Sequence, residues 1–283
     1  MQARSRPIYE EVDWRGYEVV LPVWPGVYAY GILLLPKDLK PGERRPVVVC
    51  QHGLEGRPQD LIKPSDYAGE HYYHRYAATL ADHGFIVYCP QNPYIGGDQF
   101  RSLQRMANPL KRSLFSVILG QHQRTLEWLE EQPYVDGKRI GFYGLSYGGK
   151  TAVRVPPLLD KYALAICSAD FNQWIWAVSR YDTPLGYVFG GEYEIPEFNL
   201  ANTFNHAEMA NLMAPRPFMV ERGHDDAVSR DERVAYEYAK VRRQYDLLGI
   251  PERTRIEFFN GPHTIHGVDT FQFLYQFLNW SDH

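Results

Sequence analysis

Continuous apolar runs alternate with amphipathic stretches along most of this chain of 283 residues. Residues 45–53 (RPVVVCQHG) form such a run, as expected of a strand buried on both faces of a parallel sheet. A helical pattern at 72–84 ends at Gly84, and the apolar run 85–91 follows it. This order of strand, helix and strand predicts right-handed crossovers in a mostly parallel sheet with helices on both faces.

The same alternation continues toward the C-terminus. Residues 113–132 have apolar side chains at helical spacing, which predicts a long helix. A second long helix is expected at 231–249, and a last helix is expected to begin with Asp269 as its N-cap. Further strands are expected at residues 139–144, 163–169, 216–223 and 253–260. Because no repeat or linker interrupts this pattern, we predict one α/β domain over residues 1–283.

Two regions depart from the alternation. Residues 17–36 are predicted to form two strands around Pro25 and Gly26, an N-terminal hairpin. Residues 170–214 have weak periodicity and many aromatic side chains. Structureless loops of this length are uncommon and usually act as lids or binding loops. We therefore expect a cap or lid-like insertion over the carboxyl edge of the sheet, where ligands bind in open α/β folds.

The composition excludes some classes of function. Thirty basic and thirty-four acidic residues give a formal charge of −4, which argues against a nucleic-acid binder. No apolar run approaches the ~20 residues of a membrane span. Residues 1–14 lack the apolar stretch of a signal peptide, which predicts a cytoplasmic protein or a mature secreted one. The three cysteines are expected to be buried free thiols, and no feature indicates an oligomeric state.

The sequence Gly-Leu-Ser-Tyr-Gly at 144–148 lies between an expected strand and an expected helix. A serine in such a strained turn exposes its hydroxyl above the sheet, and the flanking glycines remove side chains that would collide with neighbouring backbone. Ser146 is therefore the candidate nucleophile. Serine is a weak nucleophile at neutral pH, so it needs a base and a carboxylate that orients the base.

Candidate acids and bases follow later strands in the required order of serine, acid and histidine. Asp225 and Asp226 come after one expected strand, and His263 and His266 come after the last one. One of the two adjacent aspartates could instead cap the next helix. Asp170, after an earlier strand, is a competing acid.

An oxyanion hole would complete this chemistry. One donor is expected from the backbone N–H of Tyr147, directly after the nucleophile, and the other from the loop of residues 53–56 that follows an early strand. The alternative for that loop is an ordinary glycine-rich turn. The acids and histidines, His224 included, lack a recognised metal-ligand motif, so we expect no metal.

From about Val47 to the C-terminus, these motifs resemble the α/β-hydrolases, and more narrowly their dienelactone hydrolase and acetyl xylan esterase-like branch. The resemblance implies that Leu54, in His-Gly-Leu at 52–54, supplies the second oxyanion donor. The spacing after the Ala-Pro-Arg-Pro strand favours Asp226 over Asp225.

The same resemblance favours His263, with His266 as the reserve. Dienelactone hydrolases proper use a cysteine nucleophile, so a serine at position 146 does not imply their activity. Glucuronoyl esterases are similar in one further respect, since they carry a lysine four residues after the serine that contacts the sugar. Lys150 stands at that offset, whereas Tyr147 replaces the arginine of those enzymes. Lys150 therefore either contacts substrate or lies on the surface of its helix.

These observations predict a serine carboxylic-ester hydrolase that forms an acyl-enzyme and needs no metal or organic cofactor. Its partner would be a small-molecule or carbohydrate ester, such as an acetylated or uronate-esterified sugar. Trp174, Trp176 and Tyr187 of the insertion would contact that sugar. The alternatives are a prolyl-oligopeptidase-like peptidase, for whose propeller domain the chain is too short, and a non-catalytic binding protein on the same scaffold.

Overall fold

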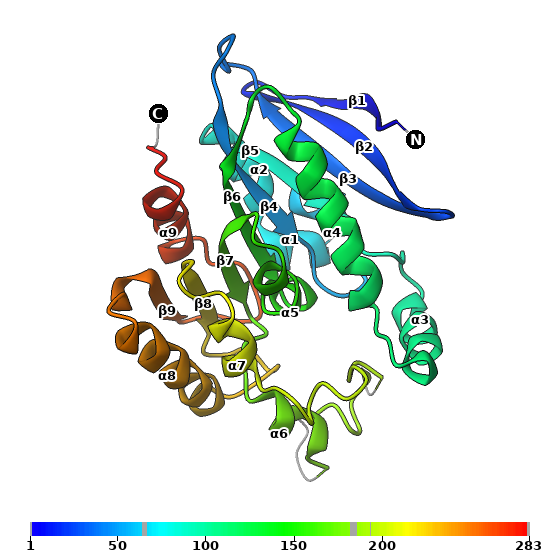
Figure 1. Ribbon diagram of the computed structural model, residues 1–283, viewed down its shortest axis with the longest axis vertical. Helices are drawn as coiled ribbons and strands as arrows, with labels where there is room; N and C mark the ends of the chain where they lie inside the picture. Colours follow the sequence, from blue (N-terminus) through cyan, green and yellow to red (C-terminus); the bar gives the residue numbers. More distant parts are fainter. Residues whose placement is uncertain (1, 64–66, 182–185, 193, 282–283) are drawn as a thin grey trace.

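The computed structural model describes residues 2–63, 67–181, 186–192 and 194–281. Within these residues, nine strands form one sheet in the order β1-β2-β3-β5-β4-β6-β7-β8-β9 (Figure 1). Six of them are parallel: β4 (Arg45–Gln51), β5 (Ile86–Pro90), β6 (Val135–Leu145), β7 (Tyr162–Ser168), β8 (Phe218–Gly223) and β9 (Thr254–Phe259). This arrangement confirms the predicted mostly parallel α/β sheet.

The N-terminal strands extend the sheet in the antiparallel sense. β2 (Trp14–Trp24) and β3 (Val27–Pro36) form the predicted hairpin, and β3 pairs with β5. The first strand, β1 (Arg4–Glu10), was not predicted, because its sequence RSRPIYE is mostly exposed and shows no apolar alternation. Trp14 is fully buried in the core, so the residues before Val47 pack on the sheet.

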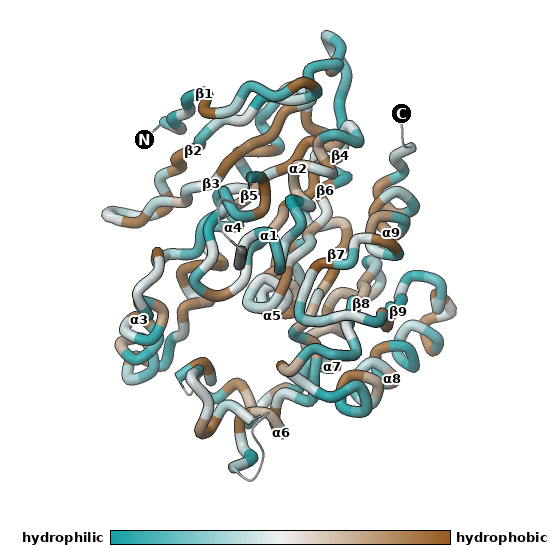
Figure 2. The backbone as a smooth tube through the Cα atoms, turned by 180° about the vertical axis from the view of Figure 1, so that it is seen from behind, coloured by the Kyte–Doolittle hydropathy of each residue, from teal (hydrophilic) through white to brown (hydrophobic). Residues whose placement is uncertain are grey.

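Helices cover both faces of the sheet. Alternate residues of β4 face opposite sides: Val47 and Val49 pack in one apolar cluster with α4 and α8, whereas Val48 and Cys50 pack in the other with α2 and α9. Figure 2 shows hydrophobic positions along the central strands. The helices are α1 (Tyr67–Tyr73), α2 (Tyr76–Asp82), α3 (Gln99–Ala107), α4 (Phe115–Glu130), α5 (Tyr147–Ala152), α6 (Trp174–Ser179), α7 (His206–Asn211), α8 (Asp231–Leu247) and α9 (Asp269–Phe277), with short 3₁₀ turns at Pro58–Leu61, Asn108–Leu110, Pro156–Leu158 and Pro251–Arg253.

Three details of the helices differ from the sequence prediction. The single helix expected at 72–84 is interrupted at His74 and Arg75, whose φ angles of 48° and 50° end α1 before α2 begins. Helix α3 was not predicted. Asp269 is the first residue of α9 rather than its N-cap.

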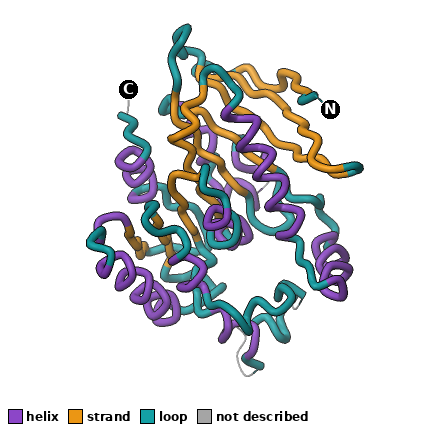
Figure 3. Tube along the Cα trace, in the orientation of Figure 1, coloured by secondary structure: helices purple, strands orange, loops and turns teal. Residues whose placement is uncertain are grey.

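The stretch between β7 and β8 is mostly loop in its described parts, with only the short helices α6 and α7 (Figure 3). It lies beyond the carboxyl ends of β6 and β7 (Figure 1). None of the described helices is both long and apolar enough to cross a membrane. Cys50, Cys89 and Cys167 are buried free thiols, as predicted.

Candidate active site

Ser146 occupies a sharp turn between β6 and α5. Its φ of 60° and ψ of −118° lie in a region that residues other than glycine rarely adopt, and such backbone strain is typical of functional sites. The surrounding structure holds the turn in place. The Ser146 N–H donates to the carbonyl of Ser168 (2.9 Å), and the Lys150 N–H donates to the carbonyl of Ser146 (2.8 Å).

The glycines beside Ser146 allow close backbone contacts. A Cβ on Gly144 would lie 2.4 Å from the backbone of Gly148, and a Cβ on Gly148 would lie 2.3 Å from the carbonyl oxygen of Gln51. Neither position can carry a side chain without moving the helix away from the sheet. This geometry confirms the reason for the glycines that the sequence suggested.

Asp226 and His263 are hydrogen-bonded, with 2.9 Å between Oδ2 and the ring Nδ1. They follow β8 and β9, so two separate crossovers bring them together. The carboxylate of Asp226 is fully buried, accepts the N–H of Val228 (2.8 Å) and lies 3.2 Å from Nη1 of Arg222. These partners orient the carboxylate, and the bond at Nδ1 leaves Nε2 of His263 as the nitrogen able to accept a proton.

The two reserve residues have other surroundings. The ring of His266 is hydrogen-bonded to the carboxylate of Glu257 and stacks on Phe259, with 4.4 Å between ring centroids. Asp225 is exposed, and its N–H donates to the carbonyl of Gly261. Neither side chain takes part in the Asp226–His263 contact.

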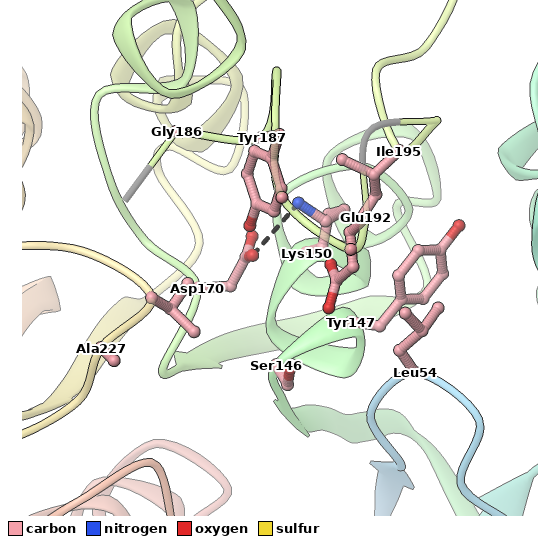
Figure 4. A pocket seen from close by; sticks show the side chains of 13 residues that line it. Leu54, Ser146, Tyr147, Lys150, Asp170, Gly186, Tyr187, Glu192, Ile195 and Ala227 are labelled. Carbon is pink, nitrogen blue, oxygen red and sulfur yellow. Dashed lines mark ion pairs between the residues drawn. The ribbon is translucent and has the colours of Figure 1, made fainter. Parts of the chain in front are cut away.

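A cavity of about 170 Å³ opens beside the nucleophile (Figure 4). Ser146, Leu54 and Tyr147 line it, which brings the nucleophile and both expected oxyanion donors to one space. Across the described residues, no hydrogen bond joins the Ser146 hydroxyl to His263 in this conformation. Catalytic hydrogen bonds are often long before substrate binds and tighten in the complex.

His52 contacts the loop of residues 53–56, which carries the expected oxyanion donor Leu54 and is called the oxyanion loop below. Its Nδ1 lies 2.7 Å from the carbonyl oxygen of Gly53, while its Nε2 accepts the N–H of Asn92 (3.3 Å). These partners assign the proton to Nδ1. Burial lowers the pKa of His52 to about 4, so the ring stays neutral at neutral pH.

Lys150 is buried, with 1% of its side chain exposed, so the alternative that it lies on the helix surface is wrong. Lys150 lines the cavity, and its Nζ lies 3.1 Å from Oδ1 of Asp170 (Figure 4). The same Nζ is 4.1 Å from the centre of the Trp174 ring. Burial raises the pKa of Asp170. Glu192 also lines the cavity, and burial raises the pKa of its carboxyl group too.

The three aromatic residues expected to contact substrate occupy different places. Tyr187 lines the cavity. Trp174 is fully buried beneath Lys150 and stacks on His206, and Trp176 lies under the guanidinium of Arg233; neither lines the cavity.

Sequence reasoning missed part of the cavity wall. Glu192, Ile195 and Val228 line it, and no motif or periodicity marks these positions. Among the described residues, no group of three His, Cys, Asp or Glu side chains is arranged to hold a metal ion.

The profile of the Prolyl oligopeptidase family matches residues 71–246. The chain belongs to the prolyl oligopeptidase family. Dipeptidyl peptidase 8 of Mus musculus is 29% identical over 165 residues, which cover 58% of this chain and 17% of that protein. The matched part is therefore a small fraction of the length of this relative.

Two solved structures have a similar fold. An acetyl xylan esterase from Paenibacillus sp. R4 has a TM-score of 0.65 at 17% identity, over 97% of this chain and 88% of that one. A glucuronoyl esterase from Solibacter usitatus has a TM-score of 0.66 at 15% identity, over 98% and 86%. Together with the family match, these likenesses confirm the predicted α/β-hydrolase fold and the expectation of a serine hydrolase.

Proposed function

We propose that this serine hydrolase cleaves carboxylic esters with Ser146 as nucleophile, His263 as general base and Asp226 as the acid that orients the base. The contact between Asp226 and His263 carries this proposal. A fully buried carboxylate that accepts hydrogen bonds on both oxygens is the environment in which a neighbouring imidazole keeps one tautomer and gains a proton readily.

The reaction follows from these positions. The Ser146 Oγ attacks the ester carbonyl carbon while Nε2 of His263 takes the hydroxyl proton, and the carbonyl π electrons move to the oxygen. The N–H groups of Leu54 and Tyr147 would stabilise that oxyanion. When the tetrahedral intermediate collapses, His263 gives the proton to the leaving alcohol. Water, deprotonated by the same ring, then attacks the acyl-enzyme and releases the acid.

The substrate we propose is a carbohydrate ester, bound through Lys150, Asp170 and Tyr187. Oδ2 of Asp170 is buried and accepts no hydrogen bond from the described residues, Nζ of Lys150 is buried in its ion pair with Oδ1 of the same carboxylate, and both residues line the cavity. Sugar hydroxyls both donate and accept, so they suit a neighbouring donor and acceptor. Trp174 would act indirectly by supporting Lys150, and Trp176 would have no direct contact. That two esterases of carbohydrates share the fold supports the same substrate class.

A peptidase is the second candidate, favoured by the match to Dipeptidyl peptidase 8. Peptide bonds and esters are cleaved by the same triad chemistry, so the substrate side of the cavity has to decide between them. A cavity of about 170 Å³ suits a short acyl group or one sugar ring more than an extended peptide.

A substrate panel tests the proposal. The panel contains p-nitrophenyl acetate, p-nitrophenyl butyrate, an acetylated xyloside, a methyl glucuronate ester and a dipeptide p-nitroanilide. We expect ester hydrolysis that Ser146→Ala abolishes, while the matched control Ser5→Ala in exposed strand β1 keeps it. Hydrolysis that survives in Ser146→Ala would exclude the mechanism. Cleavage of the anilide alone would favour the peptidase. If a fluorophosphonate probe failed to label the wild-type protein, the result would favour the alternative of a non-catalytic binding protein.

A further inference from the structure

Helix α1 contacts both of the loops that carry the proposed chemistry. On one side, the hydroxyl of Tyr73 accepts the N–H of Gly53 (2.8 Å), in the loop that holds Leu54. On the other side, the Thr264 hydroxyl donates to the carbonyl of His71 (2.9 Å), and the Ile265 N–H donates to the carbonyl of Tyr72 (2.9 Å). One helix of seven residues therefore connects the oxyanion loop with the segment directly after His263.

The early end of α1 makes the second contact available. The positive φ angles of His74 and Arg75 stop the helix at Tyr73, which leaves carbonyl groups of its last turn open to other segments. The carbonyls of His71 and Tyr72 accept from residues 264 and 265 instead. The interruption that the sequence pattern did not predict thus fixes the loop after β9.

The oxyanion loop closes around the Tyr73 hydroxyl. A Cβ on Gly53 would lie 3.1 Å from that oxygen, and a Cβ on Gly56 would lie 2.9 Å from it. The Gly53 position is also 3.1 Å from Cβ of Ser146. Both glycines therefore let the loop approach the phenol and the nucleophile together. This close approach is a specific reason for glycine that an ordinary turn would not need.

Tyr73 is suited to hold this loop still. Only 6% of its surface is exposed, and burial raises its pKa, so the phenol keeps its proton. Without its oxygen, the buried N–H of Gly53 would lose its acceptor, and the following peptide, which carries the Leu54 N–H, would be free to rotate.

We propose that Tyr73 is a positioning residue for ester hydrolysis, aligning the Leu54 N–H with the oxyanion, and that α1 couples this alignment to the placement of His263 through Thr264. This proposal rests on the proposed function of Ser146, His263 and Asp226. Tyr73 itself takes no proton and forms no covalent bond in the reaction.

The substitution Tyr73→Phe tests the first part. We expect kcat on p-nitrophenyl acetate to fall about 10- to 100-fold with KM nearly unchanged, because oxyanion stabilisation acts in the transition state. Affinity for phenylboronic acid, which forms a tetrahedral adduct with the serine, should fall by a similar factor. A purely structural role for Tyr73 would lower Tm but leave kcat and boronate affinity unchanged.

Tyr245→Phe is the matched control. It also removes a buried tyrosine hydroxyl that is bonded to the backbone, here to the carbonyl of Arg216 (2.6 Å), but in α8. We expect its activity to stay at the wild-type level. If Tyr73→Phe behaves like this control while Ser146→Ala is inactive, the inference about Tyr73 is wrong and the proposed function stands. If the wild type cleaves no ester, the proposed function itself fails.

A double-mutant cycle tests the coupling through α1. Thr264→Val removes the hydroxyl that bonds to α1 and keeps the shape of the side chain. If α1 braces both loops as one unit, the kcat losses of Tyr73→Phe and Thr264→Val are not independent, and the double variant loses less than the product of the two. Losses that multiply would overturn the coupling.

Discussion

Asp226 with His263 and Asp170 with His206 are two carboxylate–imidazole pairs whose aspartates follow the neighbouring parallel strands β8 and β7. The first pair is hydrogen-bonded at 2.9 Å, and 22% of the His263 side chain is exposed. In the second pair, 4.0 Å separate Oδ2 of Asp170 from Nε2 of His206, and the histidine is fully buried. One imidazole can meet a substrate and the other cannot.

The difference comes from the other neighbours of each pair. Asp170 lies 3.1 Å from Nζ of Lys150, so its nearest cation is a lysine rather than a histidine. His206 accepts the N–H of Asn172 at Nδ1 and stacks on Trp174, which closes its face to solvent. An aspartate at the end of a parallel strand is therefore only a candidate acid. The side chain it pairs with, and how exposed that side chain is, decide whether the aspartate takes part in the chemistry.

Replacing each acid in turn should separate the pairs most strongly. We expect Asp226→Asn to lower kcat on p-nitrophenyl acetate by about 10⁴-fold, because the imidazole loses the partner that fixes its tautomer. Asp170→Asn should lower it by less than about 10-fold, since the roles we propose for Lys150 and Asp170 lie in substrate binding rather than in the proton transfer. Equal losses in the two variants, measured under the same conditions, would contradict the assignment of Asp226.

The free energy of unfolding should separate the two sites in the opposite direction, with the larger loss at Asp170 and the smaller loss at Asp226. Lys150→Met leaves the buried carboxylate of Asp170 without its cation, and breaking a buried pair in this way costs about 3–5 kcal/mol of unfolding free energy. His263→Leu leaves Asp226 with Arg222 and the Val228 N–H, so its loss should be limited to about 1–2 kcal/mol, the value of one hydrogen bond. Urea unfolding of both variants measures the difference.

The double variant Lys150→Met with Asp170→Asn is the control for that experiment. Because it removes both charges, it should recover most of the stability lost in Lys150→Met. A double variant as unstable as the single one would show that Lys150 stabilises the fold through Trp174 rather than through Asp170.

The residues of the proposed catalytic triad could be singled out from sequence, because their signals are local. Ser146 lies in a short motif whose glycines have one geometric purpose, and Asp226 and His263 directly follow apolar strands. Of the three aromatic residues of the insertion that were expected to contact substrate, Tyr187 lines the cavity, whereas Trp174 and Trp176 do not. Aromatic enrichment does not tell which ring faces inward, so the burial of Trp174 could not be foreseen.

Features that depend on tertiary contacts could not be predicted from the sequence pattern. The pairing of Lys150 with Asp170 depends on how α5 is rotated against β7, which no spacing along the chain encodes. The break between α1 and α2 follows from two left-handed residues inside an otherwise helical pattern, and neither His74 nor Arg75 is a typical helix breaker. Glu192 reaches the cavity from a loop without periodicity.

The smallest expected effect is the share of a single buried imidazole, His206, in the pH dependence of stability. Burial lowers the pKa of His52 to about 4 and of His122 to about 3, and it lowers that of His206 as well. An unfolded histidine takes up a proton near pH 6.5, so below that pH the unfolded chain binds more protons than the folded one. Each ring should therefore lower the unfolding free energy by about 1.4 kcal/mol per pH unit as the pH falls from 6.5 toward 4.

Denaturant unfolding of the wild type at pH 6.5, 6.0, 5.5 and 5.0 measures how the unfolding free energy changes with pH. The variant His206→Gln tests the contribution of the buried His206 ring. The variant should have a shallower slope than the wild type, because one fewer ring is protonated on unfolding. An unchanged slope in His206→Gln would mean that His206 does not gain a proton on unfolding, and the contrast with His263 would then rest on exposure alone.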